Sequence, residues 1–289
     1  ALHAAGASRL TARGDAEAGG TGTTGELKPP VTVKLFYGAG NLAEAGWLAI
    51  AAFVFFYYTG VLGLSGSLVG AALFIGMCVD AAVDPFIGSW SDNLRSRWGR
   101  RLPLMVAGAP LFALGVGLHF GPPTGLAEPL LFAWLVGTGV LLRICISLFN
   151  VPYVALGAEL ADGYAERSSV VAYRAVFGIL IGLGINVLAF NVFFSGEGGL
   201  QRPERYPAFG WTVAALLMAG MAVCCVGVAR YAAALPRPEV VPRPMIGRLG
   251  GEVAEVFRNR SFRTLFFSAV IFYAAVGLNS AVTTQVNIF

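Results

Sequence analysis

The stretch Gly76-Met-Cys-Val-Asp80-Ala-Ala-Val-Asp84-Pro85 places two aspartates one helical turn apart inside an otherwise apolar segment of the chain. Residues at positions i and i+4 lie on the same face of an α-helix. A carboxylate is costly inside hydrocarbon, and where one occurs it faces the interior of a helix bundle or a polar pathway. The stretch therefore predicts a membrane-spanning helix on which Asp80 and Asp84 line a polar cavity.

The composition extends this interpretation to the whole chain. Its 289 residues are 56% hydrophobic and 12% charged, with a mean hydropathy of +0.71, whereas a soluble domain has about 25% charged residues. We therefore expect an all-α polytopic transmembrane bundle and not a nucleic-acid-binding protein. At about 1.5 Å per residue, seven apolar segments are long enough to cross about 30 Å of hydrocarbon: 35–62, 67–91, 102–121, 128–158, 168–195, 207–235 and 263–289.

Lysines and arginines set the predicted orientation. They are concentrated ahead of the first span and in the loops after the second and sixth spans, whereas the loops at 63–66 and 122–127 have none. Because Lys and Arg accumulate in cytoplasmic loops, we expect a cytoplasmic N-terminus. The predicted location is the plasma membrane, in a bacterium the inner membrane, with the lipid bilayer as the surrounding partner.

The polar segments divide the chain into four predicted parts. Residues 1–33, rich in Ala, Gly and Thr, predict a disordered cytoplasmic tail, and residues 34–235 a six-helix N-terminal bundle. Residues 236–262, with several prolines, predict a cytoplasmic linker, and residues 263–289 the first span of a second bundle. We expect the chain to be a fragment of a twelve-helix protein that is monomeric when complete.

An arginine, Arg143, lies near the middle of the fourth span at about the depth of Asp80. A guanidinium at this depth needs a partner, so we predict that it pairs with Asp80 in at least one state. The alternative is a static lock between two helices. Ser147 and Asn150 follow Arg143 at helical spacing, and Tyr153 ends this polar stretch, so we predict that they line the same cavity.

Polar residues of the first and fifth spans add to this cavity. Asn41 and Glu44 lie about two to three turns in from the cytoplasmic end of the first span, and Arg174 follows a polar stretch in the fifth. Glu44 is interpreted either as a third cavity acid or as a side chain that extends to the membrane surface. For Arg174 the alternatives are contact with a polar substrate and a similar extension to the interface.

The loop after the second span is short and strongly basic. Its aspartate can form ion pairs with the arginines between neighbouring helices, and such pairs can hold one conformation and break in the other. Cytoplasmic loop orientation alone explains the arginines but not the aspartate. The residues of this predicted cytoplasmic gate are Asp92, Arg95, Arg97, Arg100 and Arg101.

Other chemistries find little support in the sequence. The four cysteines fall in apolar spans without metal-ligand spacing, so we interpret them as small packing residues. His3 and His119 are isolated in sequence and are interpreted as incidental. The sequence contains no phosphate-binding glycine loop and no nucleophile elbow. We therefore expect neither an enzyme nor a bound cofactor, and no metal beyond a Na⁺ ion at Asp80 and Asp84.

With these features the sequence resembles the major facilitator superfamily and, within it, the glycoside–pentoside–hexuronide:cation symporters, which include the melibiose permeases. The resemblance covers nearly all of residues 34–289, and the element Asp80-Ala-x-x-Asp84-Pro85 with its basic loop is quite specific. The further matching stretches are Lys34-Leu-Phe-Tyr37-Gly38-x-Gly40, Tyr57-Tyr58-Thr59, Gly63-Leu64-Ser65, Gly88, Arg95-Ser-Arg97-Trp98-Gly99 and Asn150-x-Pro152.

The resemblance implies a secondary active transporter. Asp80 and Asp84 would bind the coupling cation, Arg174 would lie near the sugar, and two bundles would rock about the site between them. The predicted function is symport of a sugar- or glycoside-type small molecule with Na⁺ or H⁺. A lysolipid-like or other amphiphilic substrate is the first alternative, because the same broad family includes lysophospholipid transporters. A non-transporting membrane receptor or scaffold is the second.

Several positions depart from the family pattern. Asn150 stands in place of a third cation-site acid and is predicted to be a coupling residue together with Asp80 and Asp84. Glu44-Ala45 stands in place of a Lys-Asp pair. Met77 replaces an arginine one turn before the first aspartate, a place that Arg143 can fill. Val154 replaces an aromatic residue that stacks on the sugar. The departures leave open both the choice between Na⁺ and H⁺ and the identity of the substrate.

Overall fold

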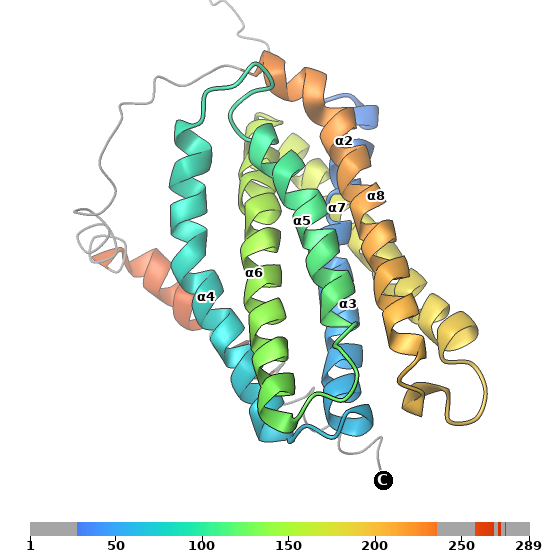
Figure 1. Cartoon of the computed structure of the whole chain (residues 1–289). Coiled ribbons are helices and arrows are strands. Elements are labelled where there is room, and N and C mark those ends of the chain that lie inside the picture. Colours follow the sequence, from blue (N-terminus) through green and yellow to red (C-terminus); the bar gives the residue numbers. More distant parts are fainter. Residues whose placement is uncertain (1–27, 236–257, 269–270, 273–274, 276–289) are drawn as a thin grey trace, which may run out of the picture. The chain divides into compact units, whose positions relative to one another are not determined.

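The structure, a computed structural model, describes most of the chain between residues 28 and 275. The described residues belong to two compact units, Ala1–Pro238 and Glu239–Phe289, and each unit is treated by itself. The first unit holds all the elements that position the candidate site (Figure 1). The residues that the structure describes are 28–235, 258–268, 271–272 and 275.

Three of the predicted parts fall wholly or partly outside these residues. Nearly all of the predicted tail at 1–33 and most of the predicted linker at 236–262 lie outside them. Of the predicted seventh span at 263–289, residues 263–268, 271–272 and 275 are described and are helical. The boundaries of these three parts remain predictions.

The elements of the first unit are helical throughout, and residues 28–235 contain no strand. Six of the helices or helix pairs are long and apolar enough to cross a membrane, which confirms the all-α prediction. They begin and end within four residues of the first six predicted spans. The elements are α2 (Val31–Ala39), α3 (Leu42–Phe56) and the π-helical turn η1 (Tyr57–Val61); α4 (Gly66–Asn93); α5 (Leu102–His119); α6 (Glu128–Glu159); α7 (Tyr164–Leu188) and the π-helical turn η2 (Ala189–Phe193); the 3₁₀ turn η3 (Gly199–Gln201); and α8 (Arg205–Ala234).

The first span is interrupted between α2 and α3 at Gly40 and Asn41. The backbone N–H of each residue donates to the carbonyl three positions back, over 3.0 Å, which tightens the chain for one turn. A Cβ on Gly40 would lie 2.8 Å from the sulfur of Cys224 and against the ring of Tyr153. Glycine at this position therefore lets the chain approach both α6 and α8 closely.

The spans pack in a definite order. α4 packs on α6, α6 on α5, and α5 on α8; α8 packs on α2 and α3, which in turn pack on α7 (Figure 1). α4 and α7 therefore stand at the two ends of this series of contacts. Both leave large apolar side chains exposed, among them Phe74 and Trp90 on α4 and Leu183 and Val187 on α7.

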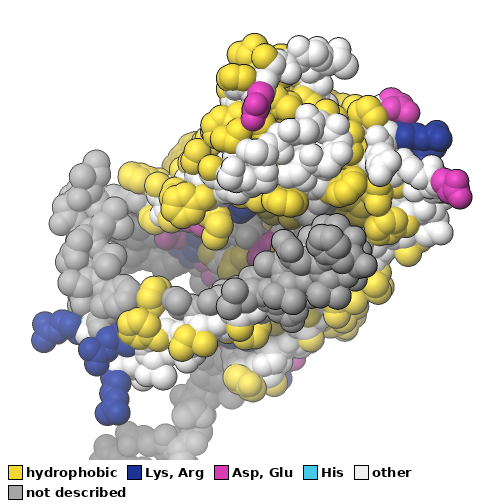
Figure 2. Space-filling model, turned by 90° about the horizontal axis from the view of Figure 1, so that it is seen from below, with side chains coloured by type: hydrophobic (Ala, Val, Ile, Leu, Met, Phe, Trp, Pro, Cys, Tyr) yellow, Lys and Arg dark blue, Asp and Glu magenta, His cyan; other side chains and the backbone are white. Residues whose placement is uncertain are grey.

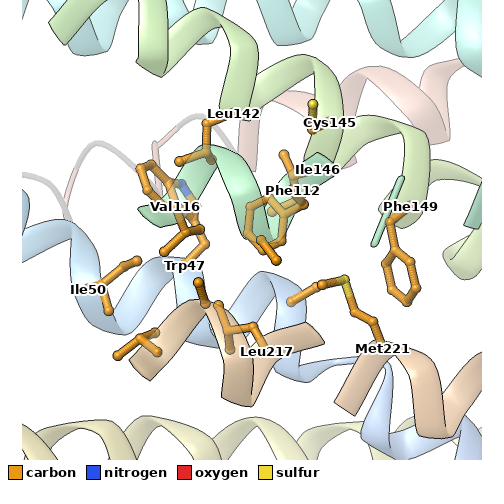
Figure 3. Packing of buried hydrophobic residues seen from close by; sticks show 14 of the residues in the cluster. Trp47, Ile50, Phe112, Val116, Leu142, Cys145, Ile146, Phe149, Leu217 and Met221 are labelled. Atoms are coloured by element: carbon orange, nitrogen blue, oxygen red, sulfur yellow. The ribbon is translucent and has the colours of Figure 1, made fainter. Parts of the chain in front are cut away.

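The core lies between α3, α5, α6 and α8, where apolar side chains interdigitate (Figure 3). Trp47, Phe112 and Leu217 are among the buried residues that meet there. Helix contacts within a membrane rely on close packing and small residues. Gly108 on α5 is one such residue, because a Cβ there would lie 2.9 Å from the backbone nitrogen of Phe149 on α6.

The cysteines are free thiols in two different settings. Cys145, Cys224 and Cys225 are buried, as expected of small packing residues. Cys78 is exposed on α4, so the prediction that all four cysteines pack inside is wrong for this residue. An apolar span gives no indication of which side of a helix is covered.

Candidate functional site

The structure joins Arg143 and Asp80 near the middle of their helices. Nη1 of Arg143 on α6 lies 2.6 Å from Oδ2 of Asp80 on α4, and the two side chains are 22% and 25% exposed. The guanidinium carbon of Arg143 lies 5.5 Å from the ring centroid of Trp47 on α3. Three spans therefore meet around one partly buried ion pair.

Two carboxylate oxygens beside this pair lack a partner. Oδ1 of Asp80 and Oδ1 of Asp84 are buried, and neither accepts a hydrogen bond from any described residue. No basic side chain among the described residues pairs with Asp84. A buried carboxylate without a partner is unfavourable. The arrangement can be satisfied by a proton or by a hard monovalent cation, which prefers oxygen ligands.

The ligand set is not complete within the protein. The described residues contain no group of three or more His, Cys, Asp or Glu side chains that could hold a metal ion. A Na⁺ ion at Asp80 and Asp84 would therefore need further oxygen ligands from backbone, water or solute. A proton would need none.

Two predicted residues of α6 do not join the pair. Ser147 is only 4% exposed, so it is packed between helices and does not line an open face. It lies beside the part of α6 that Gly108 of α5 contacts closely, and such helix packing was not visible in the sequence. Asn150 is half-buried, and its side chain has no hydrogen-bond partner among residues 28–235.

A second ion pair links the first span to α7. Nη2 of Arg174 lies 2.6 Å from Oε2 of Glu44. Nε of Arg174 donates to Oδ1 of Asn41 over 2.9 Å, and Nδ2 of Asn41 donates to the backbone oxygen of Arg174 over 3.0 Å. Arg174 and Glu44 thus bind each other, and neither side chain extends alone to the membrane surface.

Tyr153 lies beneath this second pair. The guanidinium carbon of Arg174 is 5.5 Å from the Tyr153 ring, which stacks on Tyr37 with 4.5 Å between centroids. The Tyr153 hydroxyl donates to the backbone oxygen of Tyr37 over 2.9 Å, and the Tyr37 hydroxyl donates to that of Tyr153 over 3.2 Å. Tyr153 is fully buried, so it supports Arg174 and does not offer a free hydroxyl.

The predicted cytoplasmic gate contains a residue that sequence reasoning missed. Oε1 of Glu159 at the end of α6 accepts from Nη2 of Arg100 and Nη2 of Arg101, each over 2.6 Å. Arg101 also pairs with Asp92 over 2.8 Å. Glu159 lies one residue beyond the predicted end of the fourth span at residue 158, and its acidic side chain was the signal in the sequence that could have added it to the gate.

The remaining gate arginines make different contacts. Arg97 lies over the ring of Trp98 at 5.4 Å, and neither Arg95 nor Arg97 pairs with a carboxylate among the described residues. The network of ion pairs lies inside the first unit, between α4, the following loop and α6. Whether these pairs open during a conformational change remains a prediction.

Two further contacts were not expected from the sequence. Nζ of Lys34 lies 2.7 Å from Oε2 of Glu166 and joins α2 to α7. His119, interpreted above as incidental, is 2% exposed, and its Nδ1 lies 2.8 Å from the hydroxyl of Thr138. That interpretation is wrong, because the partner of His119 lies on another span and is not apparent from its sequence neighbours.

The charged groups are framed by apolar side chains. Seen from below, a few acidic and basic side chains are visible in a recess, with hydrophobic side chains along one side of it (Figure 2). This arrangement lowers the local dielectric around the ion pairs and strengthens their mutual attraction. Near the middle of the spans the bundle thus holds two arginine–carboxylate pairs, Arg143–Asp80 and Arg174–Glu44, and of their carboxylates only Asp80 has a buried oxygen without a partner among the described residues.

Comparison with known proteins gives the family. A family model described as MFS/sugar transport protein matches residues 36–284. The chain therefore belongs to this family, within the major facilitator superfamily, and the resemblance to glycoside–pentoside–hexuronide:cation symporters is confirmed. It is a multi-pass membrane protein.

Individual relatives match a part of their length. An uncharacterized symporter of Synechocystis sp. is 36% identical over 181 residues, which are 60% of this chain and 32% of the relative. A putative glycoside/cation symporter of Escherichia coli is 29% identical over 170 residues, 58% and 37% of the two chains. A sodium-dependent lysophosphatidylcholine symporter of Mus musculus is 30% identical over 160 residues, 53% and 30%. The chain thus spans about a third of the length of these relatives.

Proposed function

We propose that this member of the MFS/sugar transport family belongs to a secondary transporter that moves a sugar- or glycoside-type solute together with Na⁺ or H⁺. One observation carries the proposal. Two buried carboxylate oxygens, on Asp80 and Asp84, have no partner among the described residues near the middle of an apolar helix. An acid kept at such a depth is rarely a packing residue.

The cation is assigned to α4. Asp80 and Asp84 lie on one helix face, and Arg143 neutralises only one of their two charges. A monovalent cation or a proton that binds there removes the remaining negative charge. The assignment is supported by the name of one relative, a glycoside/cation symporter, and by that of another, which is sodium-dependent.

The solute is assigned to the second pair. Glu44 is 48% exposed and its partner Arg174 is 25% exposed, so both groups can exchange part of their mutual contact for hydroxyl groups of a solute. Carboxylate and guanidinium together accept from and donate to neighbouring hydroxyls. Asn41 adds an amide, and the apolar face of Tyr153 lies beneath.

Coupling follows from the charges of the two sites. Neutralisation of Asp84 by the cation lowers the electrostatic cost of a bundle rearrangement that closes the cavity around the solute. Alternating access needs a second bundle opposite this one. The matched relatives are longer than the segment that this chain covers, which is consistent with a second bundle. The second bundle and the activity of the whole protein are part of the proposal.

Location and assembly complete the proposal. Basic residues on the side of the N-terminus and of the α4–α5 loop support a cytoplasmic N-terminus. We assign the protein to the plasma membrane, in a bacterium the inner membrane, and expect a monomer without a tightly bound cofactor. Like other members of its family it is assigned as a transporter and not as an enzyme.

A second candidate substrate has its own support. One relative is a lysophosphatidylcholine symporter, and α4 and α7 expose broad apolar faces along which an acyl chain can lie. An amphiphile would use Arg174 for its phosphate and these faces for its tail. A non-transporting receptor, the third candidate, would keep its function after both aspartates are neutralised.

The test is gradient-driven uptake in membrane vesicles that contain the gene product carrying this chain. Labelled glycosides, pentoses and lysophosphatidylcholine are supplied under an imposed Na⁺ or H⁺ gradient. We expect uptake of a sugar to follow one gradient and to be lost in Asp84→Asn, but to persist in Glu197→Gln, a matched removal of one carboxylate from an exposed turn. Gradient-driven uptake that is unchanged in Asp84→Asn would contradict the proposal, and uptake of the lysolipid alone would favour the second candidate.

A further inference from the structure

Arg143 is fixed in place by two neighbouring helices. Asp80 on α4 holds Nη1, and the ring of Trp47 on α3 lies against the guanidinium. The stem of Arg143 runs past Gly76, where a Cβ would lie 3.4 Å from Cγ of Arg143, an ordinary contact distance. Trp47 is itself buried and packs edgewise on His119. The positive charge is therefore held beside the aspartates by rigid surroundings.

The charges around this position give a simple sum. Asp80 and Asp84 each carry one negative charge when ionised, and Arg143 stays positive at all ordinary pH values. The net charge is therefore −1. In a medium of low dielectric a further uncompensated charge is costly. One monovalent cation brings the group to neutrality, whereas a second would make it positive.

The carboxylate oxygens that lack a hydrogen-bond partner also indicate a single cation. Arg143 occupies Oδ2 of Asp80, which leaves Oδ1 of Asp80 and Oδ1 of Asp84 without hydrogen-bond partners among the described residues. The two aspartates lie one turn apart on the same helix. A single cation between them satisfies both oxygens, and a second cation would have to displace the guanidinium.

We propose that Arg143 is a built-in counter-cation that limits the coupling site to one monovalent cation. The inference rests on the cation site of the proposed function, but it concerns the number of charges taken up and not the movement of solute. In this role Arg143 determines the stoichiometry and affinity of the ion. It also disfavours a divalent cation, which would leave the group with a net charge of +1.

Arg174 offers a matched control within the same bundle. It makes the same 2.6 Å contact with a carboxylate and lies at the same 5.5 Å from an aromatic ring. Its partner Glu44 is 48% exposed, and the charges of this pair already sum to zero. Removal of Arg174 leaves its carboxylate largely hydrated and does not change the charge next to Asp84.

The test counts cations bound by the purified gene product in detergent, without solute. Wild type, Arg143→Met, Arg143→Lys and Arg174→Met are titrated with NaCl by calorimetry, and with acid in a proton-uptake measurement if Na⁺ does not bind. Wild type, Arg143→Lys and Arg174→Met should each take up one cation. Arg143→Met should take up two, or one with about 10- to 1,000-fold higher affinity, the range by which an adjacent arginine weakens a carboxylate for protons.

Two more variants separate charge from structure. Asp80→Asn brings the group to zero and should weaken cation binding at least about tenfold, whereas Asp80→Asn combined with Arg143→Met returns it to −1 and should restore one bound cation. The comparison of the double variant with Asp80→Asn tests the role of Arg143 even if Arg143→Met alone does not fold. If Arg143→Met, or the double variant relative to Asp80→Asn, leaves stoichiometry and affinity unchanged, the inference is overturned while cation coupling stands. Failure of wild type to bind either ion overturns both.

Discussion

The α4–α6 contact and the α3–α7 contact carry the same kind of ion pair in different surroundings. Each joins an arginine to a carboxylate over 2.6 Å, with an aromatic ring 5.5 Å from the guanidinium. At the first contact the carboxylate is 25% exposed and a second aspartate stands one turn away. At the second the carboxylate is 48% exposed and the arginine also binds Asn41.

The difference lies in what each contact leaves unsatisfied. The α4–α6 contact has a net charge of −1 and two oxygens without partners among the described residues. The α3–α7 contact is neutral, and its groups are partly open to solvent. An excess of acceptors favours a cation, whereas a neutral and hydrated pair favours the hydroxyl groups of a solute. Under the proposed function, one additional acid gives the same arrangement of arginine, carboxylate and ring a second chemistry.

The two contacts also occupy equivalent places in the topology. α4 is the second span and packs on the fourth, α6; α7 is the fifth span and packs on the first, α2 with α3. If spans one to three exchange places with spans four to six, the contact between spans two and four becomes the contact between spans five and one. Internal repeats are a feature of many transporter folds, and here the first three spans supply the carboxylate and the next three the arginine of each contact.

The largest expected effect separates the two contacts by function. Glu44→Gln removes the carboxylate of the solute contact, so we expect an apparent KM for solute about tenfold higher with cation dependence retained, since one charged hydrogen bond is worth about 1.5–3 kcal/mol. Asp84→Asn should instead abolish the response to the cation gradient. Initial rates measured over a range of solute and cation concentrations distinguish the two variants. Loss of cation dependence in Glu44→Gln would show that the two contacts act as a single site.

The next effect concerns stability. Asp80→Ala leaves the guanidinium of Arg143 partly buried without its partner, so we expect a loss of about 2–4 kcal/mol in unfolding free energy. Removal of both groups in Asp80→Ala with Arg143→Leu should cost less than the single change. Glu44→Ala should cost about 1 kcal/mol or less, because its pair is more exposed. Thermal unfolding in detergent measures all three, and equal losses for Asp80→Ala and Glu44→Ala would show that the contacts do not differ in burial energy.

A smaller effect is expected from two glycines that face the arginine pairs. A Cβ on Gly178 of α7 would lie 2.7 Å from Nδ2 of Asn41, whereas a Cβ on Gly76 of α4 would lie 3.4 Å from Arg143, an ordinary contact. Gly178→Ala should therefore displace Asn41 and raise the KM for solute severalfold, with Gly76→Ala close to wild type. Gly182→Ala, with nothing within 4 Å, is the control in uptake assays. A KM for Gly178→Ala equal to that of Gly182→Ala would indicate that Asn41 does not contribute.

The smallest effect is expected at the cytoplasmic ends of the same helices. Glu159 on α6 pairs with both Arg100 and Arg101, whereas Glu166 on α7 pairs with Lys34 of α2. Glu159→Gln should lower the unfolding free energy by about 1 kcal/mol and Glu166→Gln by about half as much. Addition of salt should reduce both effects in thermal unfolding. The reverse order would show that the number of partners does not set the strength of these surface pairs.

The sequence predicted the spans well because their signal is local. Each of the six is a long apolar run bounded by polar or glycine-containing loops, and the energetic cost of exposing polar backbone to hydrocarbon forces such runs to be helical. The pairing of Asp80 with Arg143 was also predictable, since both are charged residues at the same depth. Glu44 and Arg174 were identified as cavity candidates, but their contact with each other was not.

Residues that the sequence placed wrongly or overlooked depend on helix rotation. Ser147 shares a helix with Arg143 but is buried by the close approach of α5. Glu159 and His119 find their partners on other elements, in Arg101 and Thr138. An apolar span of a membrane protein has only a weak hydrophobic pattern, because both lipid and core are apolar. It therefore does not reveal which side of a helix meets its neighbours.

By itself the sequence determined that the chain is a helical membrane bundle with two acids on one face of its second span, because length, hydropathy and i to i+4 spacing are properties of a single segment. Only the tertiary structure decided how those acids are used. In the structure Arg143 donates a hydrogen bond to one oxygen of Asp80, an oxygen of Asp84 has no partner among the described residues, and Arg174 pairs with Glu44. The charge that each contact retains is the sum over groups on two spans, α4 with α6 and α3 with α7, and that sum exists only once the helices have packed.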